Sequence, residues 1–233
     1  MIYATSDLHG YPLDRFFRLL SRAGFGDADT LFVLGDVIDR NGDGGIAMLR
    51  WMMGQDNVKL LLGNHEAMLL DCAFLFDDAA LVSDGLSPSR FEALYNWMRN
   101  GAQPTLDSLR ALQNEDGGAV EALMHYLRAA PLYETVCAGD RVFLLVHSGL
   151  ENFSPHRPLS NYAQEELLWC RPKPEDRYFE DVLTVLGHTP TRYFGCSGRM
   201  LRTPTWIDID TGAAGGGAPM LLRLNDLKPF YVE

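Results

Sequence analysis

Acidic, imidazole and amide side chains recur along this chain wherever a short apolar run gives way to a turn. In chain order they lie in Ser6–Gly10 (SDLHG), Gly35–Arg40 (GDVIDR) and Gly63–Glu66 (GNHE), and at two isolated histidines, His147 and His188. Such donors bind divalent transition metals, an arginine matches phosphate oxygens, and a spare histidine can donate a proton. These residues together predict a two-metal phosphoesterase.

The apolar runs that precede these motifs predict strands. Helical patterns separate the first three runs: one opens after Pro12 and closes at Gly24, and a shorter one runs from Ile46 to Met53. Alternating strands and helices indicate an α/β layered fold, which gathers ligands at the carboxyl ends of its strands. The expected strands are Ile2–Ala4, Leu31–Leu34, Val58–Leu62, Leu132–Val136, Val142–Val146, Val182–Leu186, Trp206–Ile209 and Met220–Leu224.

A purely helical pattern from about residue 87 to 130 interrupts this order and predicts a helical insertion. We expect it to flank the metal site and to shape substrate choice. A proline-rich connection follows over residues 150–180, with one short helix near 162–169, and residues 212–217 predict a turn between two strands. The helical spacing places Phe91, Leu94, Tyr95 and Met98 on one face and Val120, Leu123, Met124 and Leu127 on another.

Each motif also has an ordinary structural explanation. Asp7 and His9 are two residues apart, so in an extended segment both side chains would point to the same side, although a polar turn could contain both by chance. Asn64 could simply cap the helix that follows it. A lone strand-end histidine is usually a core residue, but two of them after three strand-end motifs favour ligands. His125 and His156 are assigned no chemistry.

The bulk properties limit the class of protein. With 233 residues, 47% of them apolar, the chain can bury a substantial core. A net charge of −11 disfavours nucleic-acid binding, and no apolar run is long enough to span a membrane. Because no leader fits before the first strand, a soluble cytoplasmic protein is expected, with its oligomeric state open. The cysteines, expected to be reduced, are Cys72, Cys137, Cys170 and Cys196.

Over nearly its whole length the sequence resembles the phosphoprotein phosphatase family of metallophosphoesterases, most closely its compact bacterial and phage branch. The family patterns GDxHG, GDxVDRG, GNHE, a histidine before small residues and GHT appear as SDLHG, GDVIDR, GNHE, HSG and GHT. Leu167–Arg171 (LLWCR) and Ile209–Ala213 (IDTGA) are further similarities. The resemblance implies a single calcineurin-like domain over residues 1–233, with a layered β-sandwich flanked by helices.

The resemblance also implies a role for each matched residue. Asp39 would orient His65 as the general acid, while Arg40 and Arg171 would bind phosphoryl oxygens, with Arg177 as a rival for Arg171. Ser6, Asn41 and Ser148 replace family glycines without removing a ligand, and asparagine tolerates the left-handed backbone expected after Arg40. The first metal would take Asp7, His9 and Asp36, and the second Asp36, Asn64, His147 and His188, with Asp36 bridging.

A hydroxide held between two divalent transition metals would then attack phosphorus in line. The mixed nitrogen and oxygen donors suit transition metals better than calcium or magnesium. Two such ions are expected, with manganese named first and iron or zinc as alternatives. The leading hypothesis is a serine/threonine protein phosphatase acting on phosphopeptides, which the Asp39–Arg40 pair favours by analogy. The alternatives are a hydrolase of dinucleoside polyphosphates or other small phosphoesters, and a non-catalytic metal-dependent binding module.

Overall fold

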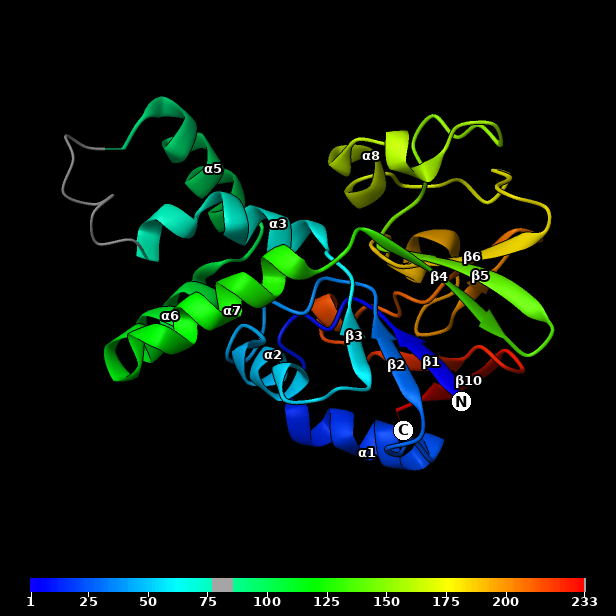
Figure 1. Cartoon of the computed structure of the whole chain (residues 1–233), viewed down its shortest axis with the longest axis horizontal. Helices are drawn as coiled ribbons and strands as arrows, with labels where there is room; N and C mark the ends of the chain where they lie inside the picture. Colours follow the sequence, from blue (N-terminus) through cyan, green and yellow to red (C-terminus); the bar gives the residue numbers. More distant parts are fainter. Residues whose placement is uncertain (77–85, 233) are drawn as a thin grey trace.

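The computed structural model describes residues 1–76 and 86–232 and contains two five-stranded sheets (Figure 1). The first sheet has the order β10-β9-β1-β2-β3, in which β1, β2 and β3 are parallel. Its strands are β1 Ile2–Thr5, β2 Thr30–Val33, β3 Val58–Leu60, β9 Met220–Arg223 and β10 Lys228–Tyr231.

The second sheet has the order β4-β5-β6-β8-β7, in which β5, β6 and β8 are parallel. Its strands are β4 Tyr133–Ala138, β5 Arg141–Val146, β6 Val182–Leu186, β7 Leu201–Arg202 and β8 Trp206–Asp208. Alternate residues of each strand point to opposite faces. Ala4, Phe32, Phe143 and Ile207 therefore meet in one apolar cluster between the two sheets, which confirms the predicted layered sandwich.

Helices cover the outer faces of both sheets. Phe16 of α1 and Leu49 of α2 pack against Tyr3 and Leu31 of the first sheet, while Leu167 of α8 packs against the second sheet. The helices are α1 Leu13–Ala23, α2 Ile46–Met53, α3 Asn64–Asp71, α5 Pro88–Arg99, α6 Gln103–Glu115, α7 Gly117–Ala129 and α8 Gln164–Leu168. The 3-10 turns are η1 Ala73–Phe76, η2 Leu159–Asn161, η3 Thr191–Phe194 and η4 Ala213–Gly215.

The predicted insertion is confirmed as α5, α6 and α7, which extend to one side of the sheets (Figure 1). The apolar face identified on α7 is buried, whereas three of the four residues on the α5 face are exposed. Phe91, Tyr95 and Met98 are exposed, and the residue that α5 buries completely is Trp97. Trp97 belongs to the apolar core, and its indole N–H donates a hydrogen bond to Asp39.

All eight predicted strands are present; β6 has the predicted bounds, and no end of the others differs by more than two residues. β7 and β10 are not among the predicted strands. β7 has only two residues, and β10 (KPFY) is an edge strand with a proline, a pattern that argues against a central strand. No helix within the described residues is long and apolar enough to cross a membrane.

Candidate metal centre

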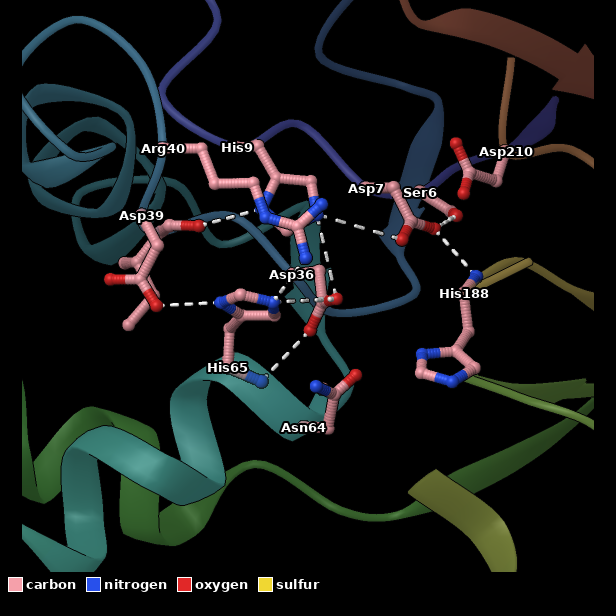
Figure 2. A network of polar contacts seen from close by, with 12 residues as sticks. Ser6, Asp7, His9, Asp36, Asp39, Arg40, Asn64, His65, His188 and Asp210 are labelled. Atoms are coloured by element: carbon pink, nitrogen blue, oxygen red, sulfur yellow. Dashed lines mark hydrogen bonds and ion pairs between the residues drawn. The ribbon is translucent and has the colours of Figure 1, made fainter. Parts of the chain in front are cut away.

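The turns after β1, β2, β3, β5 and β6 carry the predicted site residues except Arg171, which follows α8, and they surround one cavity of about 470 Å³. Figure 2 shows how the side chains from the turns after β1, β2, β3 and β6 face one another. Asp39 and His147 lie behind its wall and are fully buried. The cavity lining consists of Asp7, His9, Asp36, Arg40, Asn64, His65, Asn100, Trp169, Arg171, Pro172, His188, Thr189, Pro190, Arg192, Tyr193, Phe194 and Asp210. The motifs that are separated in sequence therefore form a single site.

The backbone of these turns is unusual. Eight non-glycine residues in the described part of the chain have positive φ, and six of them belong to the predicted site. Such conformations cost about 1–3 kcal/mol each and persist only where the surroundings enforce them, typically at functional sites. The six are Asp7, His9, Asp36, Asp39, Arg40 and His188.

The prediction that Asp7 and His9 share an extended segment is wrong, because both are left-handed, with φ of 54° and 44°. Their turn is instead held against the turn after β2. The N–H groups of Asp7 and His9 donate to the carbonyls of Gly35 and Asp36 at 3.1 and 2.9 Å. This pairing, rather than the strand period, brings the two side chains to the same side.

The first cluster of candidate ligands lies between these two turns (Figure 2). His9 Nε2 is 3.6 Å from Asp36 Oδ2 and 3.9 Å from Asp7 Oδ1. His9 Nδ1 donates to the Ile38 carbonyl at 2.9 Å, which leaves the lone pair of Nε2 facing the carboxylates. His65 also has a ring nitrogen within reach of His9 and Asp36.

The second cluster shares Asp36 and adds His147 and His188. His147 Nδ1 donates to the Leu34 carbonyl at 2.7 Å, so its Nε2 is an acceptor in the neutral ring. That Nε2 lies 3.4 Å from Asp36 Oδ1 and 2.9 Å from Asn64 Oδ1. Three acceptors therefore converge where a cation would satisfy them all.

The charges of the site also favour bound cations. Burial raises the pKa of Asp7 and raises that of Asp36 further, and the two carboxylates repel each other. Burial also lowers the pKa of His9, and that of His188 to about 2, so both rings are neutral. His188 Nε2 is buried and has no hydrogen-bond partner among the described residues. Neutral imidazoles and crowded carboxylates fit two divalent cations, which supply the missing positive charge.

His65 lies between Asp39 and Arg40. Its Nδ1 donates to Asp39 Oδ2 at 2.6 Å, and Arg40 Nη2 donates to its Nε2 at 3.0 Å, since an arginine can only donate. Burial, followed by the charges of Arg40 and His147, lowers the pKa of His65. Burial raises the pKa of Asp39 to about 7, against the hydrogen bonds it accepts from Thr105 and Trp97.

Glu66 was not among the predicted site residues, although it belongs to the GNHE motif. Its carboxylate is fully buried and accepts backbone N–H bonds from the turn after β2 and from Gly63. Gly63, not Asn64, precedes the first residue of α3, so the N-cap prediction for Asn64 is wrong and its amide faces the site instead. The spacing of Glu66 three residues after Gly63, typical of a capping box, was the available signal.

The structure corrects the expectation for the backbone of Asn41 and distinguishes the positions of Arg171 and Arg177. Asn41 does not supply the left-handed residue of its turn, because Asp39 and Arg40 have the positive φ, and its amide donates to the His9 carbonyl at 3.0 Å. Arg171 lines the cavity, with Nη1 3.5 Å from the His188 carbonyl, whereas the rival Arg177 lines a different cavity.

Nine of the cavity residues were not among the predicted site residues, and three of these nine form one part of its wall. Arg192 and Tyr193 lie on η3, directly after the His188 turn, and Trp169 ends α8. Both aromatic rings are exposed, Trp169 by 40% and Tyr193 by 67%. The wall beside the candidate metal centre is therefore aromatic and cationic.

Comparisons with known proteins agree with this geometry. Residues 1–206 match the family model described as calcineurin-like phosphoesterase. A symmetrical bis(5'-nucleosyl)-tetraphosphatase from Acidovorax sp. (strain JS42) is 29% identical over 150 residues, which are 64% of this chain and 44% of that protein. The chain thus spans less than half the length of this relative.

Two solved structures share the fold at low sequence identity. One is a candidate diadenosine tetraphosphatase with a TM-score of 0.65 and 17% identity, covering 99% of this chain and 92% of that one. The other is a serine/threonine phosphatase from Saccharomyces cerevisiae with a TM-score of 0.59 and 14% identity, covering 100% and 80%. At these identities the likeness concerns the fold alone.

Proposed function

Because the chain belongs to the calcineurin-like phosphoesterase family, we propose that it is a metal-dependent hydrolase of small phosphoesters, with dinucleoside tetraphosphates as the first substrate class. The observation that carries this proposal is the composition of one cavity, in which two clusters sharing Asp36 lie beside Arg40, Trp169 and Tyr193. Arginine suits phosphate oxygens, and an exposed aromatic ring suits a nucleobase. The names of the curated relatives support the same class.

The metal ligands are proposed residue by residue. Asp36 offers one oxygen to each cluster, which suits a carboxylate that bridges two cations. Two bound divalent ions would supply Lewis-acid charge to the phosphoryl oxygens and activate water as a nucleophile. Asp7, His9 and Asp36 would hold one ion, and Asp36, Asn64, His147 and His188 the other.

Arg40 and His65 are proposed to act together. In the substrate-free geometry Arg40 donates to His65 Nε2. A bound phosphoryl group is a more negative acceptor than the imidazole, so it draws the guanidinium away, with Arg171 as its second contact. The departure of the Arg40 guanidinium and the negative charge of the phosphoryl group both raise the pKa of His65. Nε2 is then free to carry the proton that the leaving oxygen needs.

A serine/threonine protein phosphatase is the second candidate, because the His65–Asp39 pair favours it. Asp39 fixes the tautomer of His65 through a 2.6 Å bond, as expected for a positioned general acid. A serine alkoxide is a poor leaving group and needs that proton. A nucleotide phosphate leaves as a stable anion and needs it much less.

The test measures kcat/KM with Mn²⁺ for diadenosine tetraphosphate, a phosphoserine peptide and nitrophenyl phosphate. We expect the dinucleotide to be the best substrate and to lose little activity in His65→Asn. If the phosphopeptide is best, and His65→Asn slows it about 10²- to 10⁴-fold, the second candidate is correct. His125→Asn is the matched control, since His125 is exposed on α7. Absence of turnover of all three substrates would refute both candidates and favour a non-catalytic binding module.

A further inference from the structure

Two residues of the helical insertion contact the carboxylate that orients His65. Trp97 of α5 donates through Nε1 to Asp39 Oδ2 at 2.9 Å, and Thr105 of α6 donates through its hydroxyl to Asp39 Oδ1 at 2.6 Å. Asp39, Trp97 and Thr105 are all fully buried. Asp39 Oδ2 therefore accepts hydrogen bonds from the Trp97 indole and the His65 imidazole, while Oδ1 accepts one from the Thr105 hydroxyl.

The Thr105 hydroxyl has a fixed orientation. It accepts the Asp39 backbone N–H at 2.9 Å, so its single proton is left for Asp39 Oδ1 at 2.6 Å or for the Gly44 carbonyl at 3.1 Å. The shorter, charge-assisted contact is the stronger one. Thr105 also lies in the first turn of α6, where the helix dipole favours a carboxylate.

The same insertion holds Arg40. The Arg40 N–H donates to the Gly101 carbonyl at 2.9 Å, and its Nε donates to the Asn100 carbonyl at 3.4 Å, in the link between α5 and α6. A side chain on Gly101, which has φ of +97°, would press against Arg40 Cγ. The insertion thus contacts Asp39 and Arg40, both of which touch His65.

We propose that Trp97 and Thr105 are positioning residues, which lock the Asp39 carboxylate so that His65 Nε2 points at the leaving-group oxygen. This inference rests on the proposed role of His65 as proton donor. With one donor on each oxygen from the insertion, the carboxylate has a single rotamer that satisfies all partners. Loss of either donor lets it rotate, and the imidazole follows it away from the leaving oxygen.

The test uses Trp97→Phe and Thr105→Val, which remove one donor each and keep most of the side-chain volume. The readout is kcat/KM of the Mn²⁺-loaded protein across aryl phosphates of rising leaving-group pKa, together with an alkyl phosphate. A hydrogen bond to a charged group is worth about 10- to 100-fold, so we expect roughly a 10-fold loss on the alkyl phosphate and little change on nitrophenyl phosphate. Thr105→Ser should restore the wild-type dependence.

Thr184→Val is the matched control for a buried hydroxyl, because Thr184 Oγ1 has no hydrogen-bond partner among the described residues. It should leave every rate unchanged. A uniform loss across the substrates in Thr105→Val would indicate a merely structural role and overturn the proposal. If Trp97→Phe does not fold, as judged by thermal unfolding, Thr105→Val still decides the question.

His65→Asn separates this proposal from the one on which it rests. If His65→Asn is sensitive to the leaving group but Trp97→Phe and Thr105→Val behave like wild type, positioning by the insertion is refuted and the acid role stands. If His65→Asn shows the wild-type dependence, the acid role itself is refuted. In the His65→Asn background, Thr105→Val should add no further sensitivity to the leaving group.

Discussion

Replacing Glu66 by glutamine is expected to destabilise the turns that carry Asp36 and Asn64. Glu66 is fully buried, and each of its two oxygens accepts two backbone N–H groups from these turns. Oε2 accepts from Asp36 at 2.8 Å and Gly63 at 3.1 Å, and Oε1 from Val37 at 2.8 Å and Ile38 at 3.2 Å. A carboxylate, which only accepts, is the side chain that satisfies this arrangement.

A glutamine keeps one of the two acceptor oxygens, and its NH₂ group would face the other two N–H donors. Each buried donor left unpaired costs about 1–3 kcal/mol, which gives a gross cost of roughly 2–6 kcal/mol. Loss of the buried negative charge of Glu66, which repels Asp36, offsets part of this. The net loss should be about 2–4 kcal/mol, or roughly 4–16 °C in Tm for a protein of this size.

The assay is thermal unfolding of the metal-free protein, followed by metal analysis after loading with Mn²⁺. Glu66→Gln should lower both Tm and metal content, because the same loops carry the ligands. Glu165→Gln is the matched control, since Glu165 is exposed on α8. A Tm of Glu66→Gln within about 1 °C of wild type would show that these four hydrogen bonds do not hold the site.

Three further predictions concern single residues of the site. Asp36→Asn should purify with fewer than two metals per chain, and retention of both, by metal analysis, would contradict the bridging role. Burial raises the pKa of Asp39 from 3.8 to about 7, so its ionisation destabilises the folded protein progressively as the pH rises from 3.8 to 7. Asp39→Asn should therefore flatten the fall in unfolding free energy of the metal-free protein over that range, as measured by urea denaturation. Tyr193→Ala should raise KM for diadenosine tetraphosphate about 10-fold but not for nitrophenyl phosphate, since base stacking is worth about 1–3 kcal/mol, and equal effects on both would exclude a stacking role.

The location of the candidate site could be predicted because its residue types follow from chemistry and its positions from the fold. Metals need carboxylate and imidazole donors, and parallel strands such as β1, β2 and β3 bring their carboxyl ends to the same edge. Asp7, Asp36 and Asn64 each follow one of these strands, so their meeting depends on the sheet alone. The two-sheet sandwich follows from the same apolar runs.

The geometry within the turns could not be predicted in the same way. Asp7 and His9 adopt left-handed conformations that their residue types only tolerate, and that the paired turn after β2 enforces. Asn41, the residue chosen for such a conformation on propensity, does not have it. Propensity describes what an isolated residue prefers, whereas here hydrogen bonds from another part of the chain decide.

Trp97 shows the same limit over a longer distance. Helical periodicity groups Phe91, Tyr95 and Met98 on one apolar face of α5, but these residues are exposed and Trp97 is buried. Its partner Asp39 lies 58 residues earlier in the chain, so no local pattern signals the contact. Helical periodicity treats tryptophan as an apolar side chain and takes no account of its N–H donor. Trp97 is both a member of the apolar core and a donor to Asp39, so it joins the insertion to the acidic residue behind His65.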